Sequence, residues 1–120
     1  MVSSNSDPDR IINLTPALAR LENDRELLCD LARFYLEDGP QLLQEIQHGI
    51  DTSDFELITR SAHSLKGLAS NFDAHATVAA ALAIELAGRQ QELECIEQLL
   101  PDLQLQSQKV VVALEAELLS

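Results

Sequence analysis

Apolar residues recur at intervals of three and four along most of the chain, the spacing at which a helix buries one side. The clearest such stripe comprises Phe55, Ile58, Ala62, Leu65, Ala69 and Phe72. It predicts a helix with one side in a core and the other side in water. Ser53, with Glu56 at the third position after it, predicts a capping box at the start of this helix, and residues 71–74 are expected to close it.

The segment before the stripe begins with a polar stretch. Residues 1–10 are expected to be a flexible leader or linker, and residues 11–120 a helical domain. Thr15 and Pro16 predict a short helix that runs to about Leu21, because a threonine cap followed by proline is typical of a first helical turn.

A longer helix is predicted next, with Asn23 as its cap and Glu26 as the partner of that cap. Its expected buried stripe is Leu27, Leu31, Phe34, Tyr35, Leu42, Ile46 and Ile50. Pro40 interrupts the pattern, but the stripe resumes in phase, which favours one kinked helix over two separate helices. Residues 49–52 are expected to form the turn that ends it.

Two more helices are predicted after the clearest stripe. The first runs from about Ala74 to Ala87, with Asp73 as its cap and Gly88 as its end. The second begins near Gln91, and Pro101 is expected to bend or restart it. The expected fold is therefore all-α: an antiparallel up-down four-helix bundle with a short additional N-terminal helix.

Composition narrows the class of protein. The chain has 120 residues, of which 46% are hydrophobic and only 3% aromatic, so an aliphatic core of one domain is expected. The net charge of −12 argues against nucleic acid and anionic membranes as partners. No apolar run is long enough for a membrane span, and a cytoplasmic location is expected. Cys29 and Cys95 are interpreted as small buried hydrophobic residues.

The candidate chemistry lies on the helix with the clearest stripe. At about 100° per residue, His63 falls roughly 120° from the centre of the buried stripe, so its imidazole is expected to face water. A neutral imidazole is a nucleophile near neutral pH. Lys66, one turn on, would stabilise negative charge on it. Gly67 lies in the interior of the predicted helix, where glycine lowers helix stability. Since it has no side chain, we interpret it as a position that leaves room for a group that approaches His63.

Other histidines give weaker signals. Glu45 and His48 have the spacing of one half of a carboxylate-bridged two-metal site in a helical bundle, but such a site needs a second motif and two more glutamates. His48 is therefore interpreted as a surface residue. His75 has no partner at zinc-ligand spacing and is interpreted as structural or exposed. No metal site is expected.

The residues from His63 to Gly67, followed by Ala69, Asn71, Phe72 and Ala74, resemble the signature of the histidine-containing phosphotransfer (HPt) domain of multistep two-component relays. Leu68 and Asp73 depart from the family pattern, which usually has a small residue and a glycine there. The resemblance extends more weakly from about residue 14 to residue 118 and includes Phe34, Glu85 and Arg89.

The resemblance implies a function. It implies that His63 accepts a phosphoryl group from the aspartyl phosphate of one receiver domain and passes it to an aspartate of another. Lys66 would be the charge partner and Gly67 the clearance residue. The expected rim of the docking surface is Thr59, Arg60, Ser64, Ser70 and Asn71.

The expected partners are response-regulator receiver domains, with a hybrid histidine kinase as a further one. Mg²⁺ would come from the receiver, and the chain itself would bind no cofactor. A monomer is expected, and the chain fits either a free-standing protein or a C-terminal module of a hybrid kinase. The expected activity is that of a carrier without autonomous kinase activity, because the sequence has no glycine-rich phosphate loop. The alternative hypothesis is a non-catalytic helical adaptor that binds a receiver or a partner helix.

Overall fold

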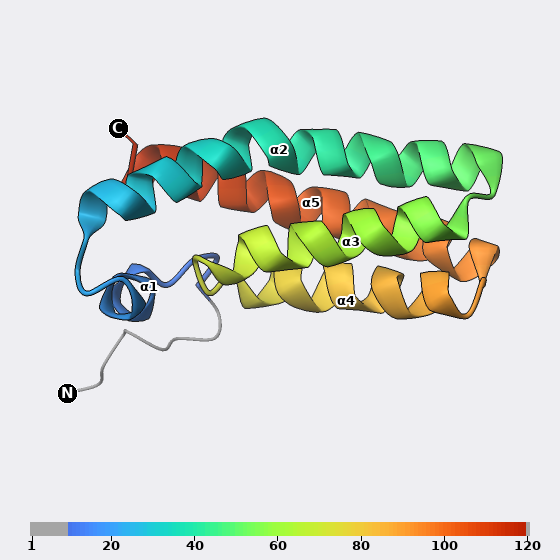
Figure 1. Ribbon diagram of the computed structural model, residues 1–120, viewed down its shortest axis with the longest axis horizontal. Helices are drawn as coiled ribbons and strands as arrows, with labels where there is room; N and C mark the ends of the chain where they lie inside the picture. The colour runs from blue at the N-terminus through green and yellow to red at the C-terminus, as the bar shows by residue number, and fades with distance from the viewer. Residues whose placement is uncertain (1–9, 120) are drawn as a thin grey trace.

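The structure, a computed structural model, describes residues 10–119, which form five helices and no strand (Figure 1). The helices are α1 (Leu14–Arg20), α2 (Arg25–Thr52), α3 (Phe55–Ser70), α4 (His75–Arg89) and α5 (Leu93–Glu117). The prediction of an all-α chain is confirmed for these residues. Most of the expected leader, residues 1–9, lies outside the described residues, while Arg10, the last residue of that stretch, forms an ion pair with Glu117.

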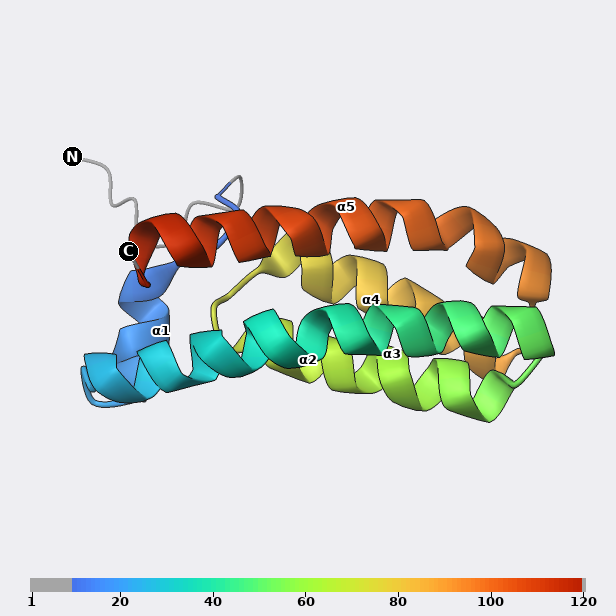
Figure 2. The same cartoon turned by 90° about the horizontal axis from the view of Figure 1, so that it is seen from above.

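The four long helices lie side by side along the longest dimension of the molecule, which measures 46 × 29 × 21 Å (Figures 1 and 2). The colours of Figure 1 show that successive long helices run in alternating directions. α3 packs between α2 and α4, and α5 packs against both α4 and α2. The short α1 lies across the end at which α2 begins.

The core is almost entirely aliphatic, as the composition predicts. Its two buried aromatic rings, Tyr35 and Phe72, meet edge to face with centroids 6.1 Å apart. The Tyr35 hydroxyl lies 2.7 Å from the hydroxyl of Ser107, which links α2 to α5. Burial raises the pKa of Tyr35 to about 12, although the hydrogen bond with Ser107 acts in the opposite direction.

The buried side of α2 differs from the predicted stripe. Leu27 and Phe34 are 42% and 55% exposed, whereas their neighbours Leu28 and Tyr35 are buried completely. At both positions two adjacent apolar residues compete for one place in the core, and the spacing alone does not choose between them. The prediction of one helix through Pro40 is confirmed, since α2 is continuous to Thr52.

The predicted turn at residues 49–52 is wrong, because these residues belong to α2. Gly49 is buried, and a Cβ built there would lie 2.5 Å from Cγ1 of Ile58. Gly88, predicted to end the fourth helix, likewise lies inside α4, with its built Cβ 2.5 Å from Oγ1 of Thr59. Both glycines allow α3 to approach closely, so their role is in packing between helices.

Two predicted caps are one residue early. Asn23 and Ser53 have left-handed backbones, with φ of 63° and 55°. The caps of α2 and α3 are the following residues, Asp24 and Asp54, whose carboxylates accept hydrogen bonds from backbone N–H groups three residues on. The capping box is wrong for both helices because the residue expected as cap completes the preceding turn.

The remaining boundaries also shift slightly. α1 begins at Leu14 and not after a Thr15 cap, and α4 begins at His75, with no side-chain cap from Asp73. α5 begins at Leu93 and is continuous through Pro101. Cys29 is half-buried and Cys95 is exposed, so the prediction of a buried cysteine is wrong for Cys95, which lies on the outer side of the first turn of α5.

Candidate functional site

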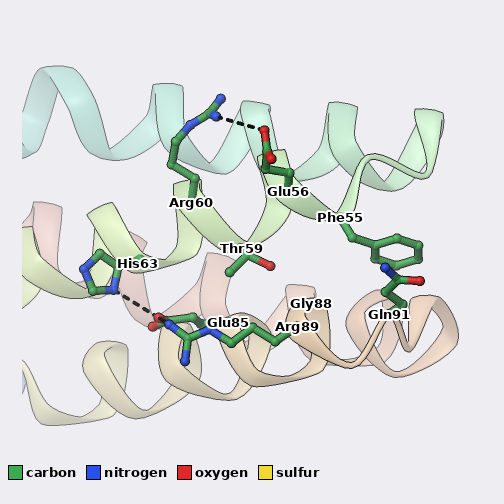
Figure 3. Close-up of a pocket in the computed structure, with 9 residues that line it drawn as sticks. All are labelled: Phe55, Glu56, Thr59, Arg60, His63, Glu85, Gly88, Arg89 and Gln91. Carbon is green, nitrogen blue, oxygen red and sulfur yellow. Dashed lines mark hydrogen bonds and ion pairs between the residues drawn. The ribbon is translucent and has the colours of Figure 1, made fainter.

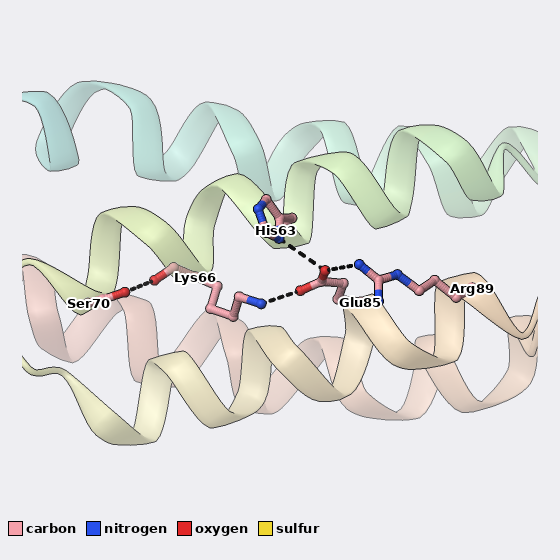
Figure 4. Close-up of polar contacts among 5 residues, drawn as sticks. All are labelled: His63, Lys66, Ser70, Glu85 and Arg89. Atoms are coloured by element: carbon pink, nitrogen blue, oxygen red, sulfur yellow. Dashed lines mark hydrogen bonds and ion pairs between the residues drawn. The ribbon is translucent and has the colours of Figure 1, made fainter.

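The water-facing side of α3 carries His63. The stripe from Ile58 to Phe72 is buried as predicted, with Phe55 partly buried at its start, and the His63 side chain is 65% exposed. The prediction that the imidazole faces water is therefore confirmed. The ring stands at the junction of α3 and α4, where a side chain of α4 reaches it (Figure 4).

That side chain is Glu85, which joins three residues. Its Oε2 lies 3.0 Å from Nδ1 of His63 and 2.6 Å from Nη2 of Arg89. Its Oε1 accepts a hydrogen bond of 2.7 Å from Nζ of Lys66. The Glu85 side chain is only 2% exposed, whereas the three groups around it extend toward the surface (Figure 4). The buried carboxylate thus holds the more exposed polar groups of α3 and α4 in place.

The charge state of Glu85 follows from these contacts. Burial by itself would raise the pKa of the Glu85 carboxyl, but the hydrogen bonds and charges of Lys66 and His63 outweigh burial and lower it. The carboxylate is therefore an acceptor at neutral pH. It favours the imidazole tautomer that has its proton on Nδ1, and this tautomer leaves a lone pair on Nε2.

A groove of about 490 Å³ runs from His63 between α3 and α4 (Figure 3). Figure 3 shows His63 at one end of it and Phe55 with Gln91 at the other. Thr59 lies along its length, and Arg89 lies beside Glu85. The groove offers space for a partner's surface directly next to the exposed imidazole.

Of the other residues of the predicted site, Thr59 and Arg60 line the groove of His63 and Ser64 follows His63 directly, whereas Ser70 and Asn71 lie at the end of α3, about two turns away. Within residues 10–119 the imidazole has its hydrogen bond with Glu85 and none with them. Arg60 is exposed, and its Nη1 lies 4.0 Å from Oε1 of Glu56 on the preceding turn. Ser64 is exposed on the side toward α2. Ser70 donates a hydrogen bond to the carbonyl of Lys66. Asn71 is half-buried, and its carbonyl accepts a hydrogen bond from Arg20 of α1.

Gly67 is exposed, and a Cβ built there would have no heavy atom within 4 Å outside its own helix turn. The packing of the described residues therefore does not require glycine at this position, in contrast to Gly49 and Gly88. The space next to Gly67 is open, as a clearance role would require.

Glu85 and Arg89 were not assigned to the site from sequence reasoning, although both fall within the family resemblance. The signal that could have identified Glu85 is its position among buried residues of the fourth helix. It follows Ile84 directly and lies one turn after Ala81, both of which are buried. A carboxylate there needs partners, and a histidine and a lysine on the adjacent helix can provide them.

The weaker histidine signals lead to no second site. Glu45 accepts a hydrogen bond from Ser61, while His48 and His75 are exposed, as interpreted from the sequence. Between residues 10 and 119, no group of three or more histidine, cysteine or acidic side chains is arranged to hold a metal ion. Over the same residues, no helix has the length and apolar character needed to cross a membrane.

Comparison with known proteins identifies a family. The family model described as the Hpt domain matches residues 30–118, which contain all of α3, α4 and α5 and most of α2. No curated protein and no solved structure matches the chain.

Proposed function

The chain belongs to the Hpt domain family, whose members carry out phosphotransfer in phosphorelays, and from this membership we propose that His63 is the residue that carries the phosphoryl group. The donor is the aspartyl phosphate of a receiver domain, and the acceptor is an aspartate of another. The observation that carries the proposal is the exposed imidazole of His63 with its Nδ1 held 3.0 Å from the buried carboxylate of Glu85.

The transfer step uses the tautomer that Glu85 favours. The Nε2 lone pair attacks phosphorus, and the bond between phosphorus and the aspartate oxygen breaks. The aspartate leaves as a carboxylate, and the Nδ1 proton stays in its hydrogen bond with Glu85, so no proton is released. The reverse sequence of bond changes delivers the group to the second receiver. Most of the rate arises from positioning and charge stabilisation.

The residues around His63 have distinct roles in this proposal. Lys66 neutralises part of the charge on the phosphoryl group, and Gly67 leaves room for it. Thr59, Arg60 and Ser64, with Ser70 and Asn71, form the rim on which the receiver docks. Mg²⁺ belongs to the receiver. The chain acts as a monomeric carrier without kinase activity of its own, on an antiparallel four-helix bundle.

The test is phosphoryl transfer from a panel of phosphorylated receiver domains to the chain, with a His63→Gln variant as control. The expected product is an acid-labile, alkali-stable label that the variant lacks, because a phosphoramidate is hydrolysed in acid. If no receiver transfers a label while circular dichroism shows an intact helical fold, the carrier function is refuted. The non-catalytic adaptor then becomes the better description.

A further inference from the structure

A second groove lies on the opposite side of His63 from the one between α3 and α4. It has a volume of about 490 Å³ and lies between α2 and α3. The α3 side is formed by Ser64, Gly67 and Leu68, and the α2 side includes Asp38 and Glu45. Ser64 follows His63 directly, and Gly67 lies one turn further on. The groove is therefore continuous with the face that carries the imidazole.

Among the described residues, the charged side chains of this groove are all acidic, whereas the other flank of His63 carries charges of both signs. Its two charged lining residues are Asp38 and Glu45, and no lysine or arginine among residues 10–119 lines it. The Glu45 carboxylate is held by a hydrogen bond of 2.9 Å from the Ser61 hydroxyl. Asp38 is exposed, and its carboxylate has no hydrogen-bond or ion-pair partner within the described part of the chain. On the α4 side of His63, the cations Lys66 and Arg89 are both paired with the carboxylate of Glu85.

An exposed aromatic ring lies on α2 one turn before Asp38. Phe34 lies four residues before Asp38, so the two side chains are neighbours on the same face of the helix. Phe34 is 55% exposed, although it is one of only four aromatic residues in the chain. A cation placed between the Asp38 carboxylate and the Phe34 ring would interact favourably with both. The apolar part of the groove, at Leu42 and Leu68, would accept an aliphatic side chain.

We propose that the groove between α2 and α3 is the second half of the docking surface, and that the receiver places in it an aliphatic side chain next to a lysine or arginine. This inference rests on the proposed function, because it takes the occupant to be the same receiver that exchanges a phosphoryl group with His63. The two flanks orient that partner: the phosphoryl group lies toward the cations of α3 and α4, and the partner's basic residue lies toward α2.

The experiment compares the kinetics of transfer from the receiver that phosphorylates the chain fastest. Asp38→Lys and Phe34→Ala are the test variants. Glu37→Lys is the matched control, since it makes the same charge change on an exposed residue of α2 that does not line the groove. Labelling by phosphoramidate, a small phosphodonor that needs no docking, shows separately whether His63 is reactive.

The expected result is a loss in kcat/KM of about tenfold for Asp38→Lys, mainly through a higher KM, because a repulsive charge replaces an attractive one at the interface. Phe34→Ala should lose several-fold, and Glu37→Lys should match the unmodified chain. Equal kinetics in all four proteins, with His63 labelled by phosphoramidate, would overturn the groove assignment alone. A loss in Glu37→Lys equal to that in Asp38→Lys would also overturn it. If neither receivers nor phosphoramidate label His63, the proposed function fails, and the inference fails with it.

Discussion

At the scale of single residues, the site depends on a buried carboxylate whose two oxygens both have polar partners. Glu85 receives contacts of 2.6 to 3.0 Å from a histidine, a lysine and an arginine. An unpaired carboxylate in this position would carry a large desolvation cost, which these three partners offset. The result is an imidazole that is exposed to a partner while one of its nitrogens is fixed in direction.

Lys66→Ala should slow phosphoryl transfer by about tenfold or more, because a cation next to the reacting group stabilises its charge in the transition state. His63 and Arg89 still contact Glu85 in this variant, so the helical fold should remain. Rapid-quench kinetics with a phosphorylated receiver measure the effect, and circular dichroism checks the fold. Transfer at the unmodified rate would remove Lys66 from the proposed mechanism.

Gly67→Ala should raise the free energy of unfolding by about 0.5–1 kcal/mol, since alanine is the better helix former and its Cβ would contact nothing beyond its own helix turn. The control is Gly49→Ala, where the new Cβ would lie 2.5 Å from Ile58 Cγ1. That change should lower stability by about 1–3 kcal/mol through overpacking. Urea unfolding of both variants provides the comparison. A loss of stability in Gly67→Ala would mean that the position serves internal packing.

At the scale of elements, the turn between α3 and α4 determines how the two halves of the site meet. Asp73 has a left-handed backbone with φ of 51°, at a position where the family usually has glycine. Its carboxylate accepts two hydrogen bonds from Arg20 of α1, at 3.0 and 3.2 Å. The same guanidinium also binds the carbonyls of Ser70 and Asn71. α1 therefore clamps the turn that connects the helices of His63 and Glu85.

Asp73→Ala should lower the free energy of unfolding by about 1–2 kcal/mol, because alanine is unfavourable in the left-handed region. Asp73→Gly should cost less, since glycine adopts this backbone freely. Both variants lose the ion pair with Arg20, which is half exposed and contributes little. Chemical denaturation distinguishes the two variants. Equal losses would show that the ion pair, and not the backbone, determines the choice of residue.

At the scale of the whole molecule, the ionised Glu85 couples stability to pH. Because the partners of Glu85 lower its pKa from the ordinary value of 4.5, the folded state binds this proton less readily than the unfolded state. The stabilisation is present in full above the ordinary pKa and is lost as the pH falls through the lowered pKa. The contribution of Glu85 is measured as a difference between two proteins.

We therefore expect the difference in unfolding free energy between the unmodified chain and Glu85→Gln to shrink as the pH falls from about 5.5 to about 3. The glutamine variant has no proton to bind at this position, so the two proteins differ in this one proton. Urea unfolding at a series of pH values measures both curves. Parallel curves over this range would contradict the lowered pKa of Glu85.

The sequence alone determined the helices and the exposure of His63, because both depend on a local repeat of about 3.6 residues. It predicted the buried stripe of α3 and the passage of α2 through Pro40. It predicted the wrong one of two neighbouring residues where both could serve, namely Leu27 in place of Leu28 in the core and Asn23 in place of Asp24 at the cap.

Only the tertiary structure decided which side chains meet. Glu85 lies 22 residues from His63, and their contact depends on the turn at Asp73 and on how α4 lies along α3. The groove between α2 and α3 depends likewise on the approach of two helices, which the buried glycine Gly49 makes close. Such distances arise from packing over the whole chain, and a pattern of neighbouring residues does not contain them.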